Sequence, residues 1–149
     1  MSTTVVVVDG VGGGIGAQIV DRIRKEGLAD LAIVALGTNA VATQRMVDAG
    51  ASRGASGENA IRVSARIGDF ILGPIGIVLP NAMMGEITPA MAQAILDAPG
   101  KKLLLPLNQP HVTIVGISQR NVNELLSDAV QALKRAMTAP RDTVAAGPD

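Results

Sequence analysis

A glycine-rich segment near the amino terminus has the composition of a phosphate-binding loop. It reads Asp9-Gly10-Val11-Gly12-Gly13-Gly14-Ile15-Gly16-Ala17 and lies between a run of valines and an amphipathic stretch. Glycines let the backbone turn tightly and approach a pyrophosphate, and a helix N-terminus offers unpaired N–H groups with a partial positive charge. The segment therefore predicts nucleotide binding, and the alternative is a structural turn that only lets helix and strand pack closely. The candidate binding residues here are Asp9, Gly10, Gly12, Gly13, Gly14, Ile15 and Gly16.

Other polar or glycine-rich groups follow later predicted strands. Thr38 and Asn39 follow the second strand, Gly73-Pro74-Ile75-Gly76 follows another, and Asn108 comes after a third. Ligands of open α/β sheets bind at the carboxyl ends of the strands, where the strand order reverses. We therefore expect one cleft lined by Asp9, Thr38, Asn39, Gly73, Pro74, Ile75, Gly76 and Asn108. Taken singly, Thr38 and Asn39 also fit plain helix caps, and the Gly-Pro-Ile-Gly segment fits a tight turn.

Three side chains are candidates for acid–base chemistry. Glu86 and Glu58 lie in polar loop segments, and His111 lies in a predicted hairpin loop. Each has a structural alternative, because Glu is favoured in the first turn of a helix and an exposed imidazole is ordinary. A single His in a chain without Cys predicts no metal site.

The elements that must position these groups alternate between strands and helices. Residues 4–8 are a valine-rich run typical of a strand buried on both faces, and residues 15–26 form an amphipathic helix that stops at Gly27. Residues 31–36 predict a second buried strand, and residues 40–49 a second helix. This order is a βαβ unit, which implies a parallel sheet.

The second half of the chain continues the alternation. Residues 60–67 fit either a strand or a helix, and the neighbouring pattern favours a helix that begins near Ser56. Further predicted elements are a strand at 70–72, a helix capped by Thr88 that ends at Asp97, strands at 103–107 and 112–117, and a last helix opened by Asn121 and Glu124. The four-residue link between the last two strands forces them antiparallel. The predicted fold is α/β: a small Rossmann-like, doubly wound, mostly parallel sheet of about five strands with an antiparallel edge strand.

The composition of the chain indicates a single domain and argues against some classes of partner. The chain has 149 residues, of which 48% are hydrophobic, and 13 basic residues balance 13 acidic ones. We expect one domain over residues 1–137 and a flexible C-terminal tail at 138–149. Zero net charge argues against nucleic acid or an anionic membrane as partner. No predicted segment resembles a targeting or membrane element, so the expected location is the cytoplasm.

Two registers of the glycine segment resemble known binding loops. Gly12-x-Gly14-x-x-Ala17 is similar to the dinucleotide-binding fingerprint, and Gly10-x-x-x-Gly14-Ile15-Gly16 resembles the loop of short-chain dehydrogenases/reductases. This resemblance covers about the first 40 residues and implies a binding loop only. The chain has no tyrosine, so it lacks the Tyr-x-x-x-Lys pair of those enzymes. The end of the second strand also has neither a carboxylate for ribose hydroxyls nor a nearby Arg for a 2′-phosphate.

A wider resemblance runs from Val5 to about Met137. The blocks that carry it are VVDGVGGGIG, ALGTNAVAT, GASGENAI, GPIGIV, MGEITPAMA and LLLPLN. They resemble a family of short bacterial proteins classed as a domain of unknown function, in which Gln often stands where this chain has Val11. The resemblance implies a small Rossmann-like domain and leaves the function open.

The expected ligand is a nucleotide, NAD or NADP, with no metal. Asp9 would orient the loop or the ribose, Thr38 and Asn39 would meet the adenosine side, and Gly73 to Gly76 would flank the nicotinamide end. A chain of this length has no room for a substrate domain, which favours a non-catalytic binding or sensing subunit. The alternatives are a small NAD(P)-dependent oxidoreductase whose proton donor is Glu86, Glu58 or His111, and a protein that binds acyl-coenzyme A.

The sequence also predicts self-association. Between residues 75 and 91 only Glu86 is charged, and the apolar residues are Ile75, Ile77, Val78, Leu79, Met83, Met84, Ile87 and Met91. Large exposed apolar patches usually mark interfaces, and Met fits irregular contact surfaces well. We expect a homodimer or a dimer of dimers with this segment at a two-fold axis. The alternative is a loop folded back over the protein's own core.

Overall fold

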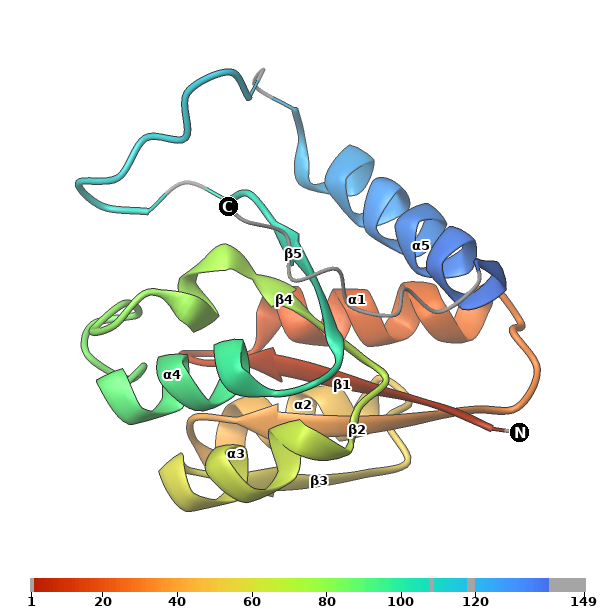
Figure 1. Ribbon diagram of the computed structural model, residues 1–149, viewed down its shortest axis with the longest axis horizontal. Helices are drawn as coiled ribbons and strands as arrows, with labels where there is room; N and C mark the ends of the chain where they lie inside the picture. Colours follow the sequence, from red (N-terminus) through yellow and green to blue (C-terminus); the bar gives the residue numbers. More distant parts are fainter. Residues whose placement is uncertain (1, 108, 118–119, 140–149) are drawn as a thin grey trace.

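The computed structural model describes residues 2–107, 109–117 and 120–139, and strands alternate with helices along the chain (Figure 1). The strands are β1 (Thr3–Asp9), β2 (Leu31–Gly37), β3 (Arg53–Ser56), β4 (Phe70–Pro74) and β5 (Lys101–Leu105). The α-helices are α1 (Gly14–Lys25), α2 (Ala40–Asp48), α3 (Glu58–Ser64), α4 (Pro89–Asp97) and α5 (Val122–Thr138). Two 3₁₀-helices, η1 (Ala65–Ile67) and η2 (Ile75–Val78), follow α3 and β4.

All five strands are parallel and lie in the order β3-β2-β1-β4-β5. Central strand β1 pairs Val5 with Ile33 of β2 on one side and with Phe70 of β4 on the other. The chain therefore builds outward from β1 to β3 and then returns to the other side of β1. The strand order reverses between β1 and β4, so a Rossmann-like sheet of this kind offers its ligand site at their carboxyl ends.

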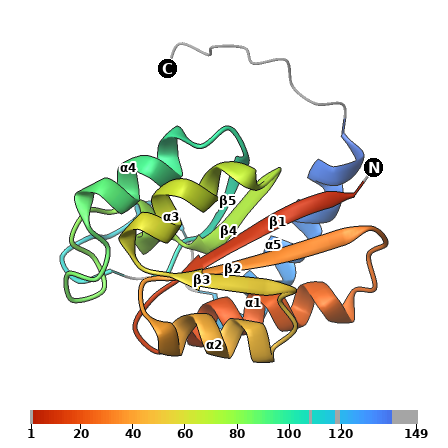
Figure 2. The same ribbon diagram turned by 90° about the horizontal axis from the view of Figure 1, so that it is seen from below.

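Helices cover both faces of the sheet (Figure 2). Val5 and Val7 of β1 pack in one core with residues of α1, α2 and α5, whereas Val6 and Val8 pack in a second core with residues of α3 and α4. Successive side chains of a strand point to opposite faces, so an unbroken valine run suits a strand covered on both sides. This confirms the interpretation of residues 4–8 as a doubly buried strand.

Local capping signals were read correctly from the sequence. The Thr88 hydroxyl oxygen accepts a hydrogen bond from the Met91 N–H at 3.1 Å, and the Asn121 side-chain oxygen accepts one from the Glu124 N–H at 2.9 Å. The ambiguous stretch at 60–67 is helical, as favoured, because Ile61 and Ala65 are the residues it buries. The helix begins at Glu58 rather than near Ser56, since residues up to Ser56 pair with β2.

The predicted antiparallel edge strand at 112–117 is wrong. Only an isolated antiparallel bridge joins Gln109 and Val112, and the described residues beyond it form no strand. The β-branched residues have no sheet face to pack against, and the side chain of Val115 is 91% exposed. Gly116, with φ +89°, also leaves the extended conformation. Sheet edge β5 is thus parallel to β4, like every other strand.

Two strand assignments also needed correction. The sequence analysis missed β3, whose residues Arg-Gly-Ala-Ser have no hydrophobic pattern and whose strand character comes from pairing with β2. Gly73 and Pro74, expected in a loop, are the last residues of β4 and pair with Leu104 and Leu105. Asn108 and the tail residues 140–149 lie outside the described residues.

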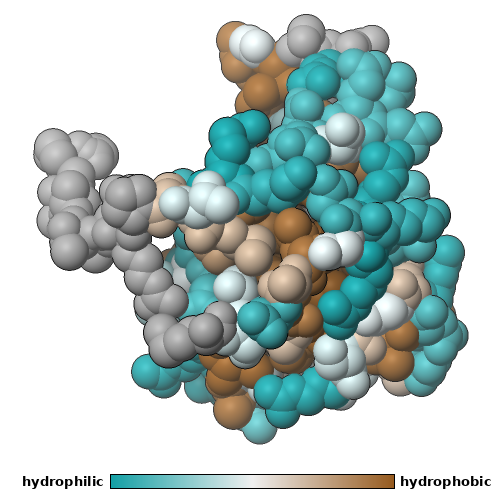
Figure 3. All heavy atoms as spheres, turned by 90° about the vertical axis from the view of Figure 1, so that its right-hand side faces the viewer, coloured by the Kyte–Doolittle hydropathy of each residue, from teal (hydrophilic) through white to brown (hydrophobic). Residues whose placement is uncertain are grey.

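The amino ends of the strands form the opposite edge of the sheet, which faces the viewer in Figure 3. Apolar and hydrophilic side chains are interspersed there, around a cavity of about 520 Å³ that Thr3, Phe70, Lys101 and Met137 help to line. None of the candidate residues from the sequence analysis lines this cavity. Among the described helices, none is long and apolar enough to cross a membrane.

Gly13 and Gly27 both have a left-handed φ, but only Gly13 is crowded. Substituting each by Ala therefore distinguishes the cost of backbone strain from the cost of a steric clash. Gly13 has φ +72° and Gly27 has φ +69°, but a Cβ on Gly13 would lie 2.7 Å from the Ala42 Cα of α2, whereas one on Gly27 would meet nothing within 4 Å. We expect Gly27→Ala to lower the free energy of unfolding by about 1 kcal/mol. Gly13→Ala should cost a further ~1–3 kcal/mol, because α1 and α2 must separate. Urea denaturation of both variants measures the difference, and equal losses would contradict the packing argument.

Candidate functional site

Three segments that are distant in sequence meet at the carboxyl ends of β1 and β2. They are the glycine loop between β1 and α1, the Thr38-Asn39 turn between β2 and α2, and the loop at residues 79–88 that precedes α4. A Cβ on Gly10 would lie 2.7 Å from the Thr38 hydroxyl oxygen and 3.1 Å from Glu86 Oε1. The structure thus brings the predicted residues Gly10, Thr38, Asn39 and Glu86 together.

Asp9, the last residue of β1, holds the glycine loop from inside. Its carboxylate is buried and accepts hydrogen bonds from the Gly10 N–H at 2.8 Å and the Gly16 N–H at 2.7 Å. Burial raises the pKa of this carboxyl above its ordinary value, and the N–H donors, together with Arg45, act in the opposite direction. Asp9 therefore orients the loop, which was one of its two expected roles. It also occupies an N–H of the first turn of α1 that an anion would otherwise use.

The glycines of the loop fall into two groups. A Cβ on Gly10, Gly13 or Gly16 would come within 2.8 Å of a neighbouring side chain or backbone, so close packing excludes a side chain there. Gly12 and Gly14 are different, because the nearest atom to an added Cβ is the Arg45 guanidinium, at 3.4 and 3.8 Å. Their φ angles also lie outside the left-handed region. Packing explains Gly10, Gly13 and Gly16 but gives no reason for Gly12 and Gly14.

Glu86 lies against the glycine loop from the opposite side. Its Oε1 accepts hydrogen bonds from the Val11 N–H at 2.8 Å, the Asn39 side-chain amide at 3.0 Å and the Thr38 hydroxyl. These donors, that of Thr38 first and that of Val11 next, lower the pKa of the carboxyl below its ordinary value, while burial acts in the opposite direction. Glu86 is therefore an ionised hydrogen-bond acceptor at neutral pH.

Val11 is the strained residue of the loop. Its φ of +52° lies in the left-handed region, which a β-branched residue rarely adopts. Glu86 accepts its N–H, and the Asn39 amide donates to its carbonyl oxygen at 2.9 Å. Asn39 also caps α2, since its side-chain oxygen accepts from the Ala42 N–H at 2.8 Å. Asn39 is thus a helix cap that also holds the glycine loop, and its role in binding a ligand stays a prediction.

The loop at residues 79–88 keeps a specific shape. Left-handed φ angles at Asn81, Met83, Met84 and Gly85 fold it back, and the Asn81 N–H donates to the Ile87 carbonyl at 2.7 Å. Ile87 is fully buried and anchors the loop in the core next to Glu86. The thioether of Met83 covers Gly10, because its sulfur lies 2.8 Å from the position of an added Cβ.

Sequence reasoning missed Arg45. This exposed residue of α2 donates from Nη1 to the Gly12 carbonyl oxygen at 2.8 Å and is thus a cation directly beside the glycine loop. A usable signal existed: Ala42 and Met46 are the buried residues of α2 that face α1, and Arg45 follows Ala42 at helical spacing.

The remaining candidates lie around this centre. A Cβ on Gly73 would lie 2.5 Å from the Val8 carbonyl oxygen, so β4 passes close to the end of β1. A Cβ on Gly76 would lie 3.0 Å from the side-chain oxygen of Gln109. Glu58 accepts a hydrogen bond from the Thr88 hydroxyl, which ties the start of α3 to the start of α4. His111 is exposed, with φ +63°, in the turn after Gln109. No described hydrogen bond joins Glu58 or His111 to the glycine loop.

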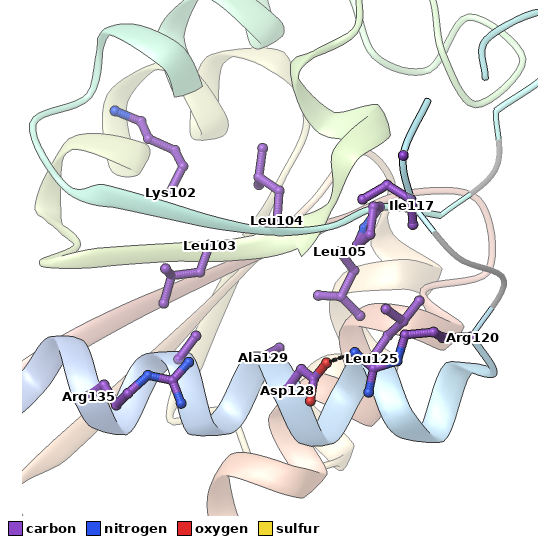
Figure 4. A pocket seen from close by; sticks show the side chains of 13 residues that line it. Lys102, Leu103, Leu104, Leu105, Ile117, Arg120, Leu125, Asp128, Ala129 and Arg135 are labelled. Atoms are coloured by element: carbon purple, nitrogen blue, oxygen red, sulfur yellow. Dashed lines mark hydrogen bonds and ion pairs between the residues drawn. The ribbon is translucent and has the colours of Figure 1, made fainter. Parts of the chain in front are cut away.

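Another cavity lies apart from the glycine loop. It measures about 680 Å³ and runs along β5 between this strand, α5 and the residues Gly116, Ile117 and Arg120 (Figure 4). Leucines of β5 and α5 line part of its walls, and its Arg120 is already paired with Asp128 and Glu124 of α5. No described group of three or more His, Asp or Glu residues could hold a metal ion. Convergent polar groups therefore mark the glycine loop, rather than this cavity, as the candidate site.

The position of Glu86 predicts a pH effect on stability. Because its pKa is lowered on folding, the folded state gains stability from the ionised carboxylate above the ordinary value of 4.5 and loses it as the pH falls through the lowered pKa. We expect Glu86→Gln to destabilise the protein most at pH 7, and the difference from wild type to shrink below about pH 4.5. Urea denaturation from pH 7 to pH 3 tests this, with Glu26→Gln, a surface carboxylate paired with Lys134, as control. A constant difference over this range would contradict it.

Comparison with known families matches the chain to a family model, and no curated protein matches it. The matching family is described as a domain of unknown function (DUF3842), and its match spans residues 4–138. This covers every strand except the first residue of β1, every helix, and all parts of the site described above. The chain belongs to this family of unknown function, as its sequence blocks predicted.

Proposed function

We propose that this protein binds an adenine dinucleotide, NAD or NADP, across its glycine loop. The observation that carries the proposal is the pair Gly12 and Gly14. Neither glycine is required by packing, and Gly14, the first residue of α1, costs the helix stability that Ala would not. A ligand that approaches the backbone closely would explain both.

The polar groups around these glycines suit a phosphate. Among the described residues, none accepts a hydrogen bond from the N–H of Gly12 or Gly14. The Gly14 N–H lies in the first turn of α1, where the helix dipole favours an anion, and Gly12 directly precedes the N-cap residue Gly13. The Arg45 guanidinium lies beside them and can donate to phosphate oxygens. A pyrophosphate over Gly12 and Gly14 would thus meet two N–H donors and one cation.

The strand order supports the same place. The reversal between β1 and β4 is where Rossmann-like sheets hold dinucleotides. In the proposed arrangement the adenosine lies over the Thr38-Asn39 turn at the end of β2, and the other half of the ligand extends toward Gly73 and Gly76 at the end of β4.

The role we favour is a binding or sensing subunit rather than an oxidoreductase. A proton donor must hold a proton near neutral pH, whereas the lowered pKa of Glu86 keeps its carboxylate ionised. Glu58 is engaged by Thr88, and His111 has no described bond to the loop. Turnover of reduced cofactor across a panel of carbonyl substrates, abolished by Glu86→Gln, would overturn this preference.

Titration of the purified protein tests the proposal. Calorimetry with NAD⁺, NADH, NADP⁺, NADPH, ATP and an acyl-coenzyme A should give micromolar binding of at least one dinucleotide. Gly14→Val should weaken that binding at least about tenfold, because the side chain would stand where the phosphate approaches. It should leave stability nearly unchanged, since only Arg45 lies within 4 Å of the new Cβ.

Ala90→Val, at an exposed position in the first turn of α4, is the matched control and should bind like wild type. Two results would contradict the proposal: silence of all dinucleotides, or unchanged binding by a folded Gly14→Val variant. The glycine loop would then be structural throughout.

We also propose that the protein self-associates through the loop at residues 79–88. Within the segment singled out for this role, Ile77, Ile87 and Met91 are buried in the protein's own core, whereas the side chain of Met84 at the loop tip is 98% exposed. An exposed Met on an ordered loop next to a ligand edge suits a contact with a second copy.

Light scattering at micromolar concentration measures this association. We expect a mass of at least twice the 15.2 kDa of one chain, reduced to that of a monomer by Met84→Glu. The substitution should not affect folding, because the side chain contacts solvent. A monomeric wild-type protein would overturn the idea.

A further inference from the structure

The end of β2 lacks the carboxylate that Rossmann-like proteins usually place there for the ribose, and another segment supplies one. Thr38 follows β2 directly, and its hydroxyl donates to Glu86, which lies 48 residues further along the chain. Asn39, the next residue, donates to the same oxygen at 3.0 Å. Glu86 thus occupies the space at the end of β2 although it belongs to the loop before α4.

The carboxylate is fixed on one side and open on the other. All three described donors, from Val11, Thr38 and Asn39, bond to Oε1. No described residue donates to Oε2. A carboxylate held in this way can accept a hydrogen bond from a ligand hydroxyl at Oε2 while the three donors to Oε1 keep it in place.

We propose that Glu86 is the ribose-binding residue of the nucleotide site and that it selects a ribose with free hydroxyls, so that the ligand is NAD rather than NADP or coenzyme A. This inference rests on the proposed function and specifies its ligand. An ionised carboxylate accepts hydrogen bonds from hydroxyls but repels a phosphate group attached to the same ribose. NADP carries such a phosphate at the 2′ position and coenzyme A at the 3′ position, whereas NAD carries none.

Arg45 lies beside the place proposed for the phosphates of the ligand. Its guanidinium lies 3.4 Å from the position of a Cβ on Gly12, on the α2 side of the loop, and its Nη1 donates to the Gly12 carbonyl. Glu86 instead bonds the neighbouring N–H of Val11. The cation therefore serves the bridging phosphates over Gly12 and Gly14, and the carboxylate serves the ribose. If Arg45 instead bound a 2′-phosphate, NADP would be the tighter ligand and Arg45→Ala would remove that preference.

Calorimetric titration with NAD⁺, NADP⁺ and coenzyme A tests the selection. The wild-type protein should bind NAD⁺ at least about tenfold more tightly than NADP⁺ or coenzyme A, as one hydrogen bond to a charged group implies. Glu86→Gln keeps an acceptor for the Val11 N–H but removes the charge. It should weaken NAD⁺ binding about tenfold and leave NADP⁺ binding equal or tighter, so that the ratio of the two affinities collapses. Glu26→Gln, far from the loop and paired with Lys134, should keep the wild-type ratio.

The outcomes separate this inference from the proposed function. If no dinucleotide binds to the wild-type protein, the proposed function fails and the inference fails with it. If NAD⁺ and NADP⁺ bind with equal affinity, or if folded Glu86→Gln keeps the wild-type ratio, only the inference fails. The wild-type ratio is informative by itself, so a Glu86→Gln variant that does not fold still leaves a decisive measurement.

Discussion

Crowding at the turn between β1 and α1 is the constraint on which this structure depends. A side chain on Gly10 would meet Thr38, one on Gly13 would meet the backbone of α2, and one on Gly16 would meet Met46 and Asp9. These close approaches let α1 and α2 lie together on the sheet while the loop of residues 79–88 covers the turn. The carboxylate of Asp9 completes the arrangement, because it satisfies the buried N–H groups of Gly10 and Gly16.

The contacts in this turn distinguish glycines that packing requires from glycines that it does not require, a distinction that the sequence alone cannot make. Gly10, Gly13 and Gly16 serve packing, whereas Gly12 and Gly14 face open space beside Arg45. A purely structural loop would not need the last two, since an Ala Cβ fits the space at either position and Ala at position 14 would also favour the helix. The packing interpretation therefore holds at Gly10, Gly13 and Gly16, and the proposed binding role concerns Gly12 and Gly14.

The features that could be predicted from the sequence are those that depend on residues close together in the chain. The valine run of β1, the cap at Thr88 and the capping pair of Asn121 and Glu124 were all identified because their physics is local. The strands were harder. β3 has no apolar pattern and exists because it pairs with the edge of β2, whereas residues 112–117 have a strand-like pattern but pair with no described strand. Pairing is decided by the whole fold, and side-chain pattern is a weak guide to it.

The position of Glu86 was beyond sequence reasoning for a related reason. It was recognised as a polar residue in an apolar segment, but its place beside the glycine loop follows from left-handed conformations at Asn81, Met83 and Met84 and from the burial of Ile87. These conformations fold the loop back toward the glycine loop, and the hydrophobic pattern of the sequence does not predict them. The result places a negative charge on one side of the glycine loop and Arg45 on the other. A bound dinucleotide would then have only one favourable orientation, because its phosphates and its ribose hydroxyls seek opposite charges.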